Sequence, residues 1–363
     1  MAKPRKRPTS PRVNVRVTAA AARPFARWST RGGRRQLTIG NGLFTVTLWP
    51  EKGGAITSYV YRPANLEVMW RNPYGQPPRL RVQDQPMGHE SDLFDVMDGS
   101  WYVSLPNGFF PGDYFGAPVG THGEIRSVPW TVEKISTGAR ELRVELCGRS
   151  VRTPFVYRRE LIVRAGSPLL QWRETVANRA ARSLPVAWLQ HPAFGGPLVA
   201  GARLVTSARK IAVYVADDPT AMQVKSGYAG NYPLVPERES GGMRDCSVVP
   251  AAGSGLDHSV QFSDFQAGRG CIWNDQLGLG FGMEWDLKLF PIAWSWACGG
   301  GRQEYPLWGE GHLVTLQPST SPVGRFSDLV RQKQVLMIPA RGEVTTELTT
   351  GFVHEPDGPW AQP

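Results

Sequence analysis

The chain has 363 residues, of which 41% are hydrophobic and 10% are aromatic. This length and composition provide for a sizeable core and exclude a globally disordered protein. The formal net charge is +10, but residues 1–35 hold 11 of the 41 basic side chains and no acid, so the remaining body is almost neutral. We therefore expect residues 1–35 to form a disordered or extended basic tail outside the core, and we do not expect nucleic acid to be a partner.

Nothing in the sequence marks a targeting or membrane segment. The basic tail lacks the apolar run of a signal peptide, and no window approaches the roughly 18 apolar residues that span a bilayer. The four cysteines are far apart and form no paired motif: Cys147, Cys246, Cys271 and Cys298. We expect mostly buried thiols in a reducing cytoplasm, with one chance disulfide as the alternative.

The predicted elements are short strands punctuated by glycine and proline. Residues 37–48 alternate apolar and polar side chains around Asn41-Gly42, which predicts a hairpin with a type I′ turn. Residues 71–120 contain several proline- and glycine-rich stretches, and we expect a long loop there that contributes to a site. Strands return at residue 128 and continue to residue 352, with one short helix expected within residues 324–332.

This density of strands predicts an all-β fold class, as a large sandwich or barrel. No internal repeat and no linker interrupts the chain after the tail. We therefore expect a single domain over residues 36–352 and a C-terminal tail over residues 353–363.

Histidines are the first candidates for chemistry, because the sequence contains no nucleotide-binding, zinc-protease or serine-hydrolase motif. Four of them lie in distinctive settings: His122 between glycines, His191 before a proline, His258 after an aspartate, and His312 at the start of a strand. Histidine acts as an acid or base near neutral pH. For any single histidine, however, a structural or surface role is the commoner alternative. A metal held by His122, His191 and His312 is a weaker alternative, because no second-shell pattern supports it.

Tryptophans are the second signal, with 13 in the chain. Trp294 and Trp296 alternate along one predicted strand and so project from the same face. Indole faces suit the C–H surface of a sugar ring, while polar neighbours bind its hydroxyls. The alternative is that most of these rings simply pack the β core.

An ordered series of motifs resembles the aldose 1-epimerases of the galactose mutarotase-like superfamily. The series reads "LTIGNGLFTVTLWPEKGGAI", "GSWYVSLPNGFF", "THGEIRSVPW", "RRELIV" with "WRETVANRA", "AWLQHPAFG", and finally "LVTLQPSTSP" with "IPARGEVTTELTTGF". It extends from about residue 36 to about residue 352. The resemblance implies a large antiparallel β-supersandwich with loops over a sugar cleft, and a site without a cofactor.

The resemblance also implies roles for individual residues. His191, in "HPAFG", corresponds to the general acid that protonates the ring oxygen and opens the hemiacetal. His122 corresponds to a histidine that hydrogen-bonds the sugar near its ring. Arg126 corresponds to an arginine of the related hexose-phosphate mutarotases and is expected to bind a hydroxyl or an anion. With Arg126, the expected substrate-binding residues are Asn107, Asp257, Gln317 and Trp296.

Two positions depart from the family pattern. Gln317 stands where the family has the glutamate that acts as the base, and an amide cannot accept a proton at neutral pH. Either Glu310 supplies the base, or another acid such as Asp257, Glu284 or Asp286 has taken over, or the cleft serves binding or other sugar chemistry. In addition, "DGSWYV" replaces an arginine-glycine-glycine run, which disfavours a phosphorylated substrate.

We therefore expect an aldose 1-epimerase-like enzyme that interconverts sugar anomers by general acid–base catalysis, with His191, His122 and Glu310 as its catalytic residues. The alternatives are another sugar chemistry on the same scaffold, such as an epimerase, lyase or glycoside-cleaving enzyme, and a sugar-binding protein without catalysis. The expected ligand is a monosaccharide or small glycoside. The expected assembly is a monomer or a homodimer.

Overall fold

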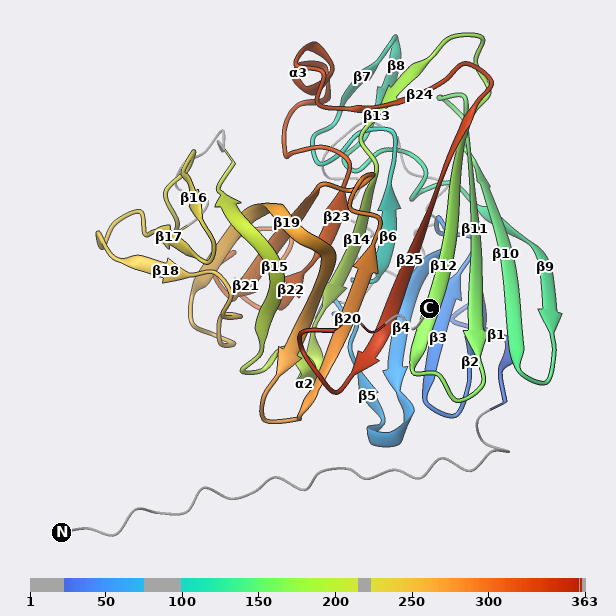
Figure 1. The fold of residues 1–363 in the computed structure, drawn as a ribbon, viewed down its shortest axis with the longest axis horizontal. Helices are drawn as coiled ribbons and strands as arrows, with labels where there is room; N and C mark the ends of the chain where they lie inside the picture. The colour runs from blue at the N-terminus through green and yellow to red at the C-terminus, as the bar shows by residue number, and fades with distance from the viewer. Residues whose placement is uncertain (1–22, 75–98, 215–222, 359, 361–363) are drawn as a thin grey trace.

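The computed structural model describes residues 23–74, 99–214, 223–358 and 360. Within them, every ladder between named strands of the main sheet is antiparallel, and two rows of strands pack against each other (Figure 1). One row runs, in spatial order, through β9 (Trp130–Thr137), β10 (Glu141–Arg149), β11 (Phe155–Arg164), β12 (Leu169–Asn178), β25 (Glu343–Val353), β20 (Leu279–Trp285), β19 (Leu256–Asn274), β15 (Arg203–Ala212) and β16 (Ala229–Asn231).

The second row ends beside β19, the long strand that also belongs to the first row. It runs through β1 (Phe25–Arg31), β2 (Arg34–Gly40), β3 (Phe44–Trp49), β4 (Ala55–Tyr61) with β5 (Leu66–Glu67), β6 (Trp101–Ser104), β14 (Leu189–Phe194), β22 (His312–Thr315), β23 (Gln317–Ser319) and β21 (Ile292–Gly299). β19 pairs with β20 near its C-terminal end and with β21 near its N-terminal end, so it joins the two rows. The result is the predicted antiparallel β-supersandwich.

Small elements cover the ends of the rows. Three two-stranded ribbons and three short helical segments do this: β7 (Gly112–Tyr114) with β8 (Ala117–Val119), β13 (Leu184–Val186) with β24 (Leu336–Ile338), β17 (Leu234–Pro236) with β18 (Met243–Asp245), η1 (Arg62–Ala64), α2 (Gly196–Val199) and α3 (Phe326–Arg331). Figure 1 shows β7, β8, β13, β24 and α3 together at one end of the molecule. The short helix predicted within residues 324–332 is confirmed as α3. No helix among the described residues is long and apolar enough to span a membrane.

Alternation of side chains explains most of the strands. Phe44, Val46 and Leu48 on β3 are fully buried, and the residues between them are partly exposed. Such a period of two places one face of each strand in the core between the rows. One contiguous hydrophobic cluster unites both rows.

A fully buried ion pair lies in this core next to the strand that carries His191. The Nε of Arg159 is 2.7 Å from Oε1 of Glu174, and neither side chain is exposed to solvent. The guanidinium lies over the rings of Trp130 and Trp172, at 5.0 and 4.8 Å. The other carboxylate oxygen of Glu174 accepts a 2.6 Å hydrogen bond from the side chain of Gln190 on β14. The pair therefore anchors β14 from the core side.

The predicted boundaries need correction at the N-terminus. Residues 25–35 belong to the sheet, because β1 pairs with β2 along its whole length around the turn at Gly32 and Gly33. The arginines that suggested a mobile arm stay on the surface, where the Arg35 guanidinium covers the Trp28 ring at 4.1 Å. Residues 1–22 of the predicted tail lie outside the described residues.

Two local predictions also change. The hairpin around Asn41-Gly42 is confirmed, but neither residue has a positive φ, so the turn is not type I′. Instead the Asn41 side chain accepts hydrogen bonds from the backbone N–H groups of Leu43 and Phe44. Within the predicted loop over residues 71–120, β6 is a fully buried strand, and residues 75–98 lie outside the described residues.

We predict that Glu174→Gln lowers the free energy of unfolding by about 3–5 kcal/mol, because it leaves the buried Arg159 guanidinium uncompensated. Asp264→Asn is the matched control, since its exposed pair with Arg209 has the same 2.7 Å separation and exposed pairs contribute about 0–1 kcal/mol. Urea unfolding of the two variants measures both values. Equal losses would show that the buried pair does not stabilise the core more than a surface pair.

Candidate active site

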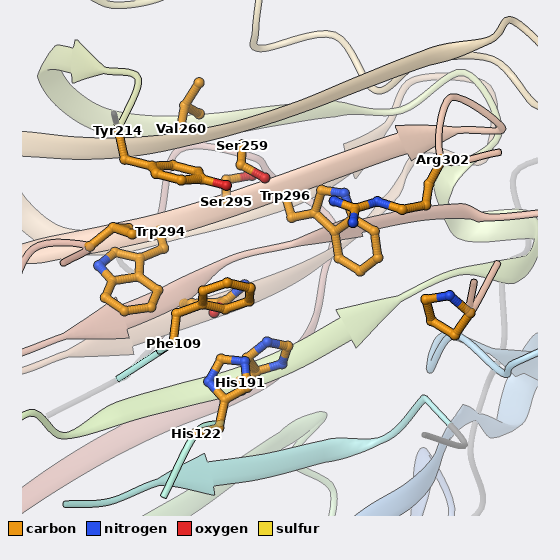
Figure 2. Close-up of a pocket in the computed structure, with 13 residues that line it drawn as sticks. Phe109, His122, His191, Tyr214, Ser259, Val260, Trp294, Ser295, Trp296 and Arg302 are labelled. Carbon is orange, nitrogen blue, oxygen red and sulfur yellow. The ribbon is translucent and has the colours of Figure 1, made fainter. Parts of the chain in front are cut away.

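A cavity opens between β14, β19, β21 and β23, and segments that follow β6 and β21 complete its lining (Figure 2). Its empty volume, counted together with the solvent at its mouth, is about 730 Å³. Its walls combine aromatic rings with a few polar groups: Phe109, His122, His191, Tyr214, Ser259, Val260, Trp294, Ser295, Trp296, Arg302, Pro306, Gln317 and Val323.

His191 is positioned by strand pairing. It lies opposite Tyr102 in the antiparallel ladder between β14 and β6. The two rings stack, with centroids 4.5 Å apart and planes inclined by 12°. Nδ1 of His191 is buried and has no hydrogen-bond partner among the described residues. The ring is thus fixed by stacking while a polar atom remains unsatisfied.

His122 reaches the same place from a turn. Its φ of +61° is in the left-handed region, a conformation that non-glycine residues adopt at a cost and often at functional sites. Gly123 must be glycine, because a Cβ there would lie 2.0 Å from the Leu105 carbonyl oxygen. Nδ1 of His122 is 2.9 Å from Oγ of Ser104 on β6. The His122 and His191 centroids are 4.6 Å apart, so their predicted convergence is confirmed.

Both imidazoles are neutral near pH 7. Burial is the largest cause, and it lowers the pKa of His191 to about 3 and the pKa of His122 well below its usual value. The positive charge of Arg126 lowers both pKa values further. A neutral imidazole can donate one hydrogen bond and accept another. The protonated form, imidazolium, protonates a ring oxygen most readily. In the unliganded protein neither histidine is in that form.

Aromatic rings form the wall beside the histidines. Trp294 and Trp296 both project from β21 into the cavity, as their spacing predicted (Figure 2). The indole N–H of Trp294 donates to the Ser321 carbonyl at 3.0 Å, and that of Trp296 donates to Oδ1 of Asp257 at 2.8 Å. Because each indole is held by its N–H, its face is presented in a fixed orientation.

Gln317 lines the cavity, and Leu316 points into the opposite core, as strand alternation predicted. The side-chain Nε2 of Gln317 donates to Oγ1 of Thr315 at 2.7 Å. Its Oε1 is buried with no hydrogen-bond partner among the described residues. An unsatisfied buried acceptor favours a ligand that brings a donor, such as a hydroxyl.

Asp257 lies behind the cavity wall rather than in it. Its side chain is 1% exposed, and its Oδ2 is 3.5 Å from Nε of Arg302. Burial raises the pKa of this carboxyl group above its usual value, and Arg302 counteracts the rise. Arg302 lines the cavity, whereas Asp257 lies behind Trp296 and Arg302 and contacts both, so its contact with substrate stays a prediction.

Three other predicted contacts are not at the cavity. The Nε of Arg126 donates to the Thr121 carbonyl, and the charge of Arg126 lowers the pKa of both histidines. The amide of Asn107 donates to the Phe110 and Gly120 carbonyls and so braces the turn that carries His122. Glu310, the expected base, is exposed and does not line the cavity, because its turn directs it to solvent.

The remaining candidates also lie elsewhere. Glu284 accepts a hydrogen bond from the Trp360 backbone, and Asp286 from that of Lys288. His258 is buried, and Nε2 of His312 is 3.1 Å from the Pro250 carbonyl oxygen, so neither lines the cavity. Among the described residues, the lining contains no carboxylate.

The sequence analysis missed several lining residues: Phe109, Tyr214, Ser259, Ser295 and Arg302. In the ladder between β19 and β21, Ser259 lies opposite Trp296, and Ser295 lies opposite Val260. Figure 2 shows these hydroxyls and Tyr214 across the cavity from the two histidines. The alternation of "HSVQF" could have indicated Ser259, but "GGGRQEYP" has no pattern that marks Arg302.

Comparison with known proteins identifies the fold. A Klebsiella pneumoniae protein provisionally described as an aldose 1-epimerase aligns over 89% of this chain and 80% of its own, with a TM-score of 0.67 and 15% identity. A galactose mutarotase-like protein from Clostridium acetobutylicum aligns over 91% and 99%, with a TM-score of 0.63 and 12% identity. A galactose mutarotase related enzyme from Lactobacillus acidophilus aligns over 89% and 98%, with a TM-score of 0.59 and 14% identity.

These similarities show that the chain has the galactose mutarotase-like fold. No family sequence profile matches the chain, and no curated protein is significantly similar to it in sequence. At identities of 12–15%, the likeness concerns the fold. The chemistry must therefore be argued from the cavity itself.

We predict that the protein loses stability as the pH falls from about 6.5 toward about 3. Over this range His191 binds a proton in the unfolded chain but not in the folded protein, because its pKa is lowered on folding. The slope reaches about 1.4 kcal/mol per pH unit for each such histidine. His191→Gln should flatten the slope, and the exposed His354→Gln should not. Chemical unfolding at several pH values measures it, and an unchanged slope in His191→Gln would contradict the lowered pKa.

Proposed function

We propose that the protein binds a sugar ring in this cavity and acts on its anomeric centre as an aldose 1-epimerase-like enzyme with slow turnover. The observation that carries the proposal is the convergence of His122, His191 and Gln317 against a wall formed by Trp294 and Trp296. Residues distant in sequence supply paired hydrogen-bonding groups on one side and fixed aromatic faces on another. This combination suits a pyranose, which has apolar C–H faces and a polar rim.

Two unpaired polar atoms and the imidazole of His122 match the rim of such a ring. The buried Nδ1 of His191 and Oε1 of Gln317 have no partner among the described residues, and Ser104 orients the ring of His122. Sugar hydroxyls both donate and accept, so they satisfy these atoms whichever tautomer each imidazole adopts. Satisfying them on binding favours a polyhydroxylated ligand over an apolar one of the same size.

The reaction follows from proton positions. Solvent first protonates His191, and the imidazolium gives that proton to the ring oxygen as the bond from that oxygen to the anomeric carbon breaks. The anomeric hydroxyl loses its proton to solvent water, because the described lining supplies no carboxylate. The aldehyde then rotates about its bond to C2 and recloses on either face. Gln317 can hold the anomeric hydroxyl but cannot take its proton. Because His191 is also neutral, we expect natural turnover to be slow.

Sugar binding without reaction is the second candidate. The observation that favours it is the lack of a carboxylate among the described residues of the lining. General acid–base catalysis needs both partners within hydrogen-bonding reach of the protons that move. A protein of this kind would bind both anomers and leave their ratio to the solvent.

We also propose a ligand class and a cellular compartment. The ligand is a monosaccharide or small glycoside, and the proposed site uses the protein's own side chains alone. All four cysteines are buried and free, which fits a reducing compartment, and we propose the cytoplasm.

We predict that Gln317→Glu raises the rate of anomer interconversion by about 100-fold, because it places a base where the anomeric hydroxyl is held. Polarimetry on freshly dissolved aldoses and uronic acids measures the rate. Gln334→Glu, at an exposed position, is the matched control and should leave the rate unchanged. Thermal unfolding reports whether the buried carboxylate is tolerated.

Two outcomes would contradict this assignment. A natural protein that already interconverts anomers at a full enzymatic rate, with no gain in Gln317→Glu, would mean that Gln317 is not at the base position. Failure of both proteins to interconvert any aldose, with sugar binding retained, would favour the binding protein over the enzyme.

A further inference from the structure

Arg302 is the only charged residue among the described residues that line the cavity. Its side chain is 34% exposed, whereas that of Asp257 behind it is 1% exposed. The buried carboxylate therefore approaches the guanidinium from the protein side, at Nε, with a separation of 3.5 Å. A guanidinium held at Nε still presents its two terminal nitrogens, which form the fork that binds carboxylates and phosphates.

The guanidinium is held in place by more than one contact. Its carbon lies 6.0 Å from the centroid of the Trp296 ring. The indole N–H of Trp296 donates to the other oxygen of the same Asp257 carboxylate. Asp257 thus orients a cation and an aromatic face together, and Figure 2 shows both on the same side of the cavity. A ring packed on Trp296 would bring its substituents near Arg302.

The charges around the cavity also favour an anion. Arg126 lies close enough to lower the pKa of both His122 and His191. Asp257 offsets part of the charge of Arg302 from behind, and the described lining of the cavity holds no carboxylate. In a partly desolvated site, the positive charge of a guanidinium attracts an anionic group more strongly than it would in water.

We infer that the ligand is an acidic sugar, whose anionic substituent is bound by the terminal nitrogens of Arg302 while its ring lies against Trp296. This inference rests on the proposed function and narrows its substrate class. The anionic substituent is a carboxylate, as in a uronic acid, or a phosphate, as in a sugar phosphate. A single guanidinium matches a planar carboxylate in charge and in geometry, so uronic acids are the first ligands to test.

The experiment compares four probes by titration calorimetry at constant ionic strength: D-glucuronate, D-galacturonate, D-glucose 6-phosphate and D-glucose. Natural protein should bind at least one of the acidic sugars about tenfold or more tightly than D-glucose, as expected for charge-assisted hydrogen bonds. Preference between the uronates and the phosphate identifies the anionic group. Raising the salt concentration should weaken the acidic sugars selectively.

Arg302→Gln should remove the preference, lowering affinity for the acidic sugar about tenfold while changing that for D-glucose less than about twofold. Arg302→Lys keeps the charge but loses the fork, and should restore part of the preference. The exposed Arg209→Gln is the matched control and should bind like the natural protein. Circular dichroism and thermal unfolding establish that each variant is folded.

The outcomes separate the two proposals. Equal binding of acidic and neutral sugars, or an equal loss of both in Arg302→Gln, overturns the acidic-sugar inference and leaves the sugar-binding cavity intact. No binding of any of the four probes, together with no anomer interconversion of them by the natural protein, overturns the proposed function as well.

Discussion

The candidate site depends on the pairing of β6 with β14. Tyr102 and Ser104 lie two residues apart on β6, so they share a face, and each holds one histidine: Tyr102 stacks on His191, and Ser104 hydrogen-bonds His122. The register sets His191 opposite Tyr102. A slip of one residue would turn His191 to the opposite face of the sheet. The neighbouring Gln190 resists such a slip, because its side chain is bonded in the core to Glu174.

This construction explains the electrostatic character of the cavity. Burial disfavours the charged forms of both imidazoles and holds their pKa values below the usual range, so both are neutral near pH 7. The amide of Gln317 and the guanidinium of Arg302 complete a set rich in hydrogen-bond donors and poor in bases. The described cavity is therefore better equipped to hold hydroxyls and an anion than to remove a proton. That imbalance links the slow turnover we propose to the acidic ligand we infer.

The alternation of short strands was sufficient to predict the fold class. The meeting of His122 with His191 was predicted from the resemblance of their motifs to those of a known family. The sequence was insufficient for β6, whose residues are all buried and show no alternation. It placed Glu310 at the site from proximity in sequence to a motif, whereas the side chain is exposed to solvent. It missed Arg302, because a glycine-rich segment with no periodicity does not reveal which way a side chain points.

The most direct test is nitrogen-15 NMR of the imidazole rings of His122 and His191, assigned with single-histidine variants, during a pH titration and then with added sugar. The account predicts that both rings stay neutral from about pH 8 to about pH 5 in the free protein, and that bound sugar shifts their nitrogen resonances. Rings that titrate near pH 6.5, with resonances that no sugar perturbs, would show that these histidines are neither buried together nor part of a sugar site.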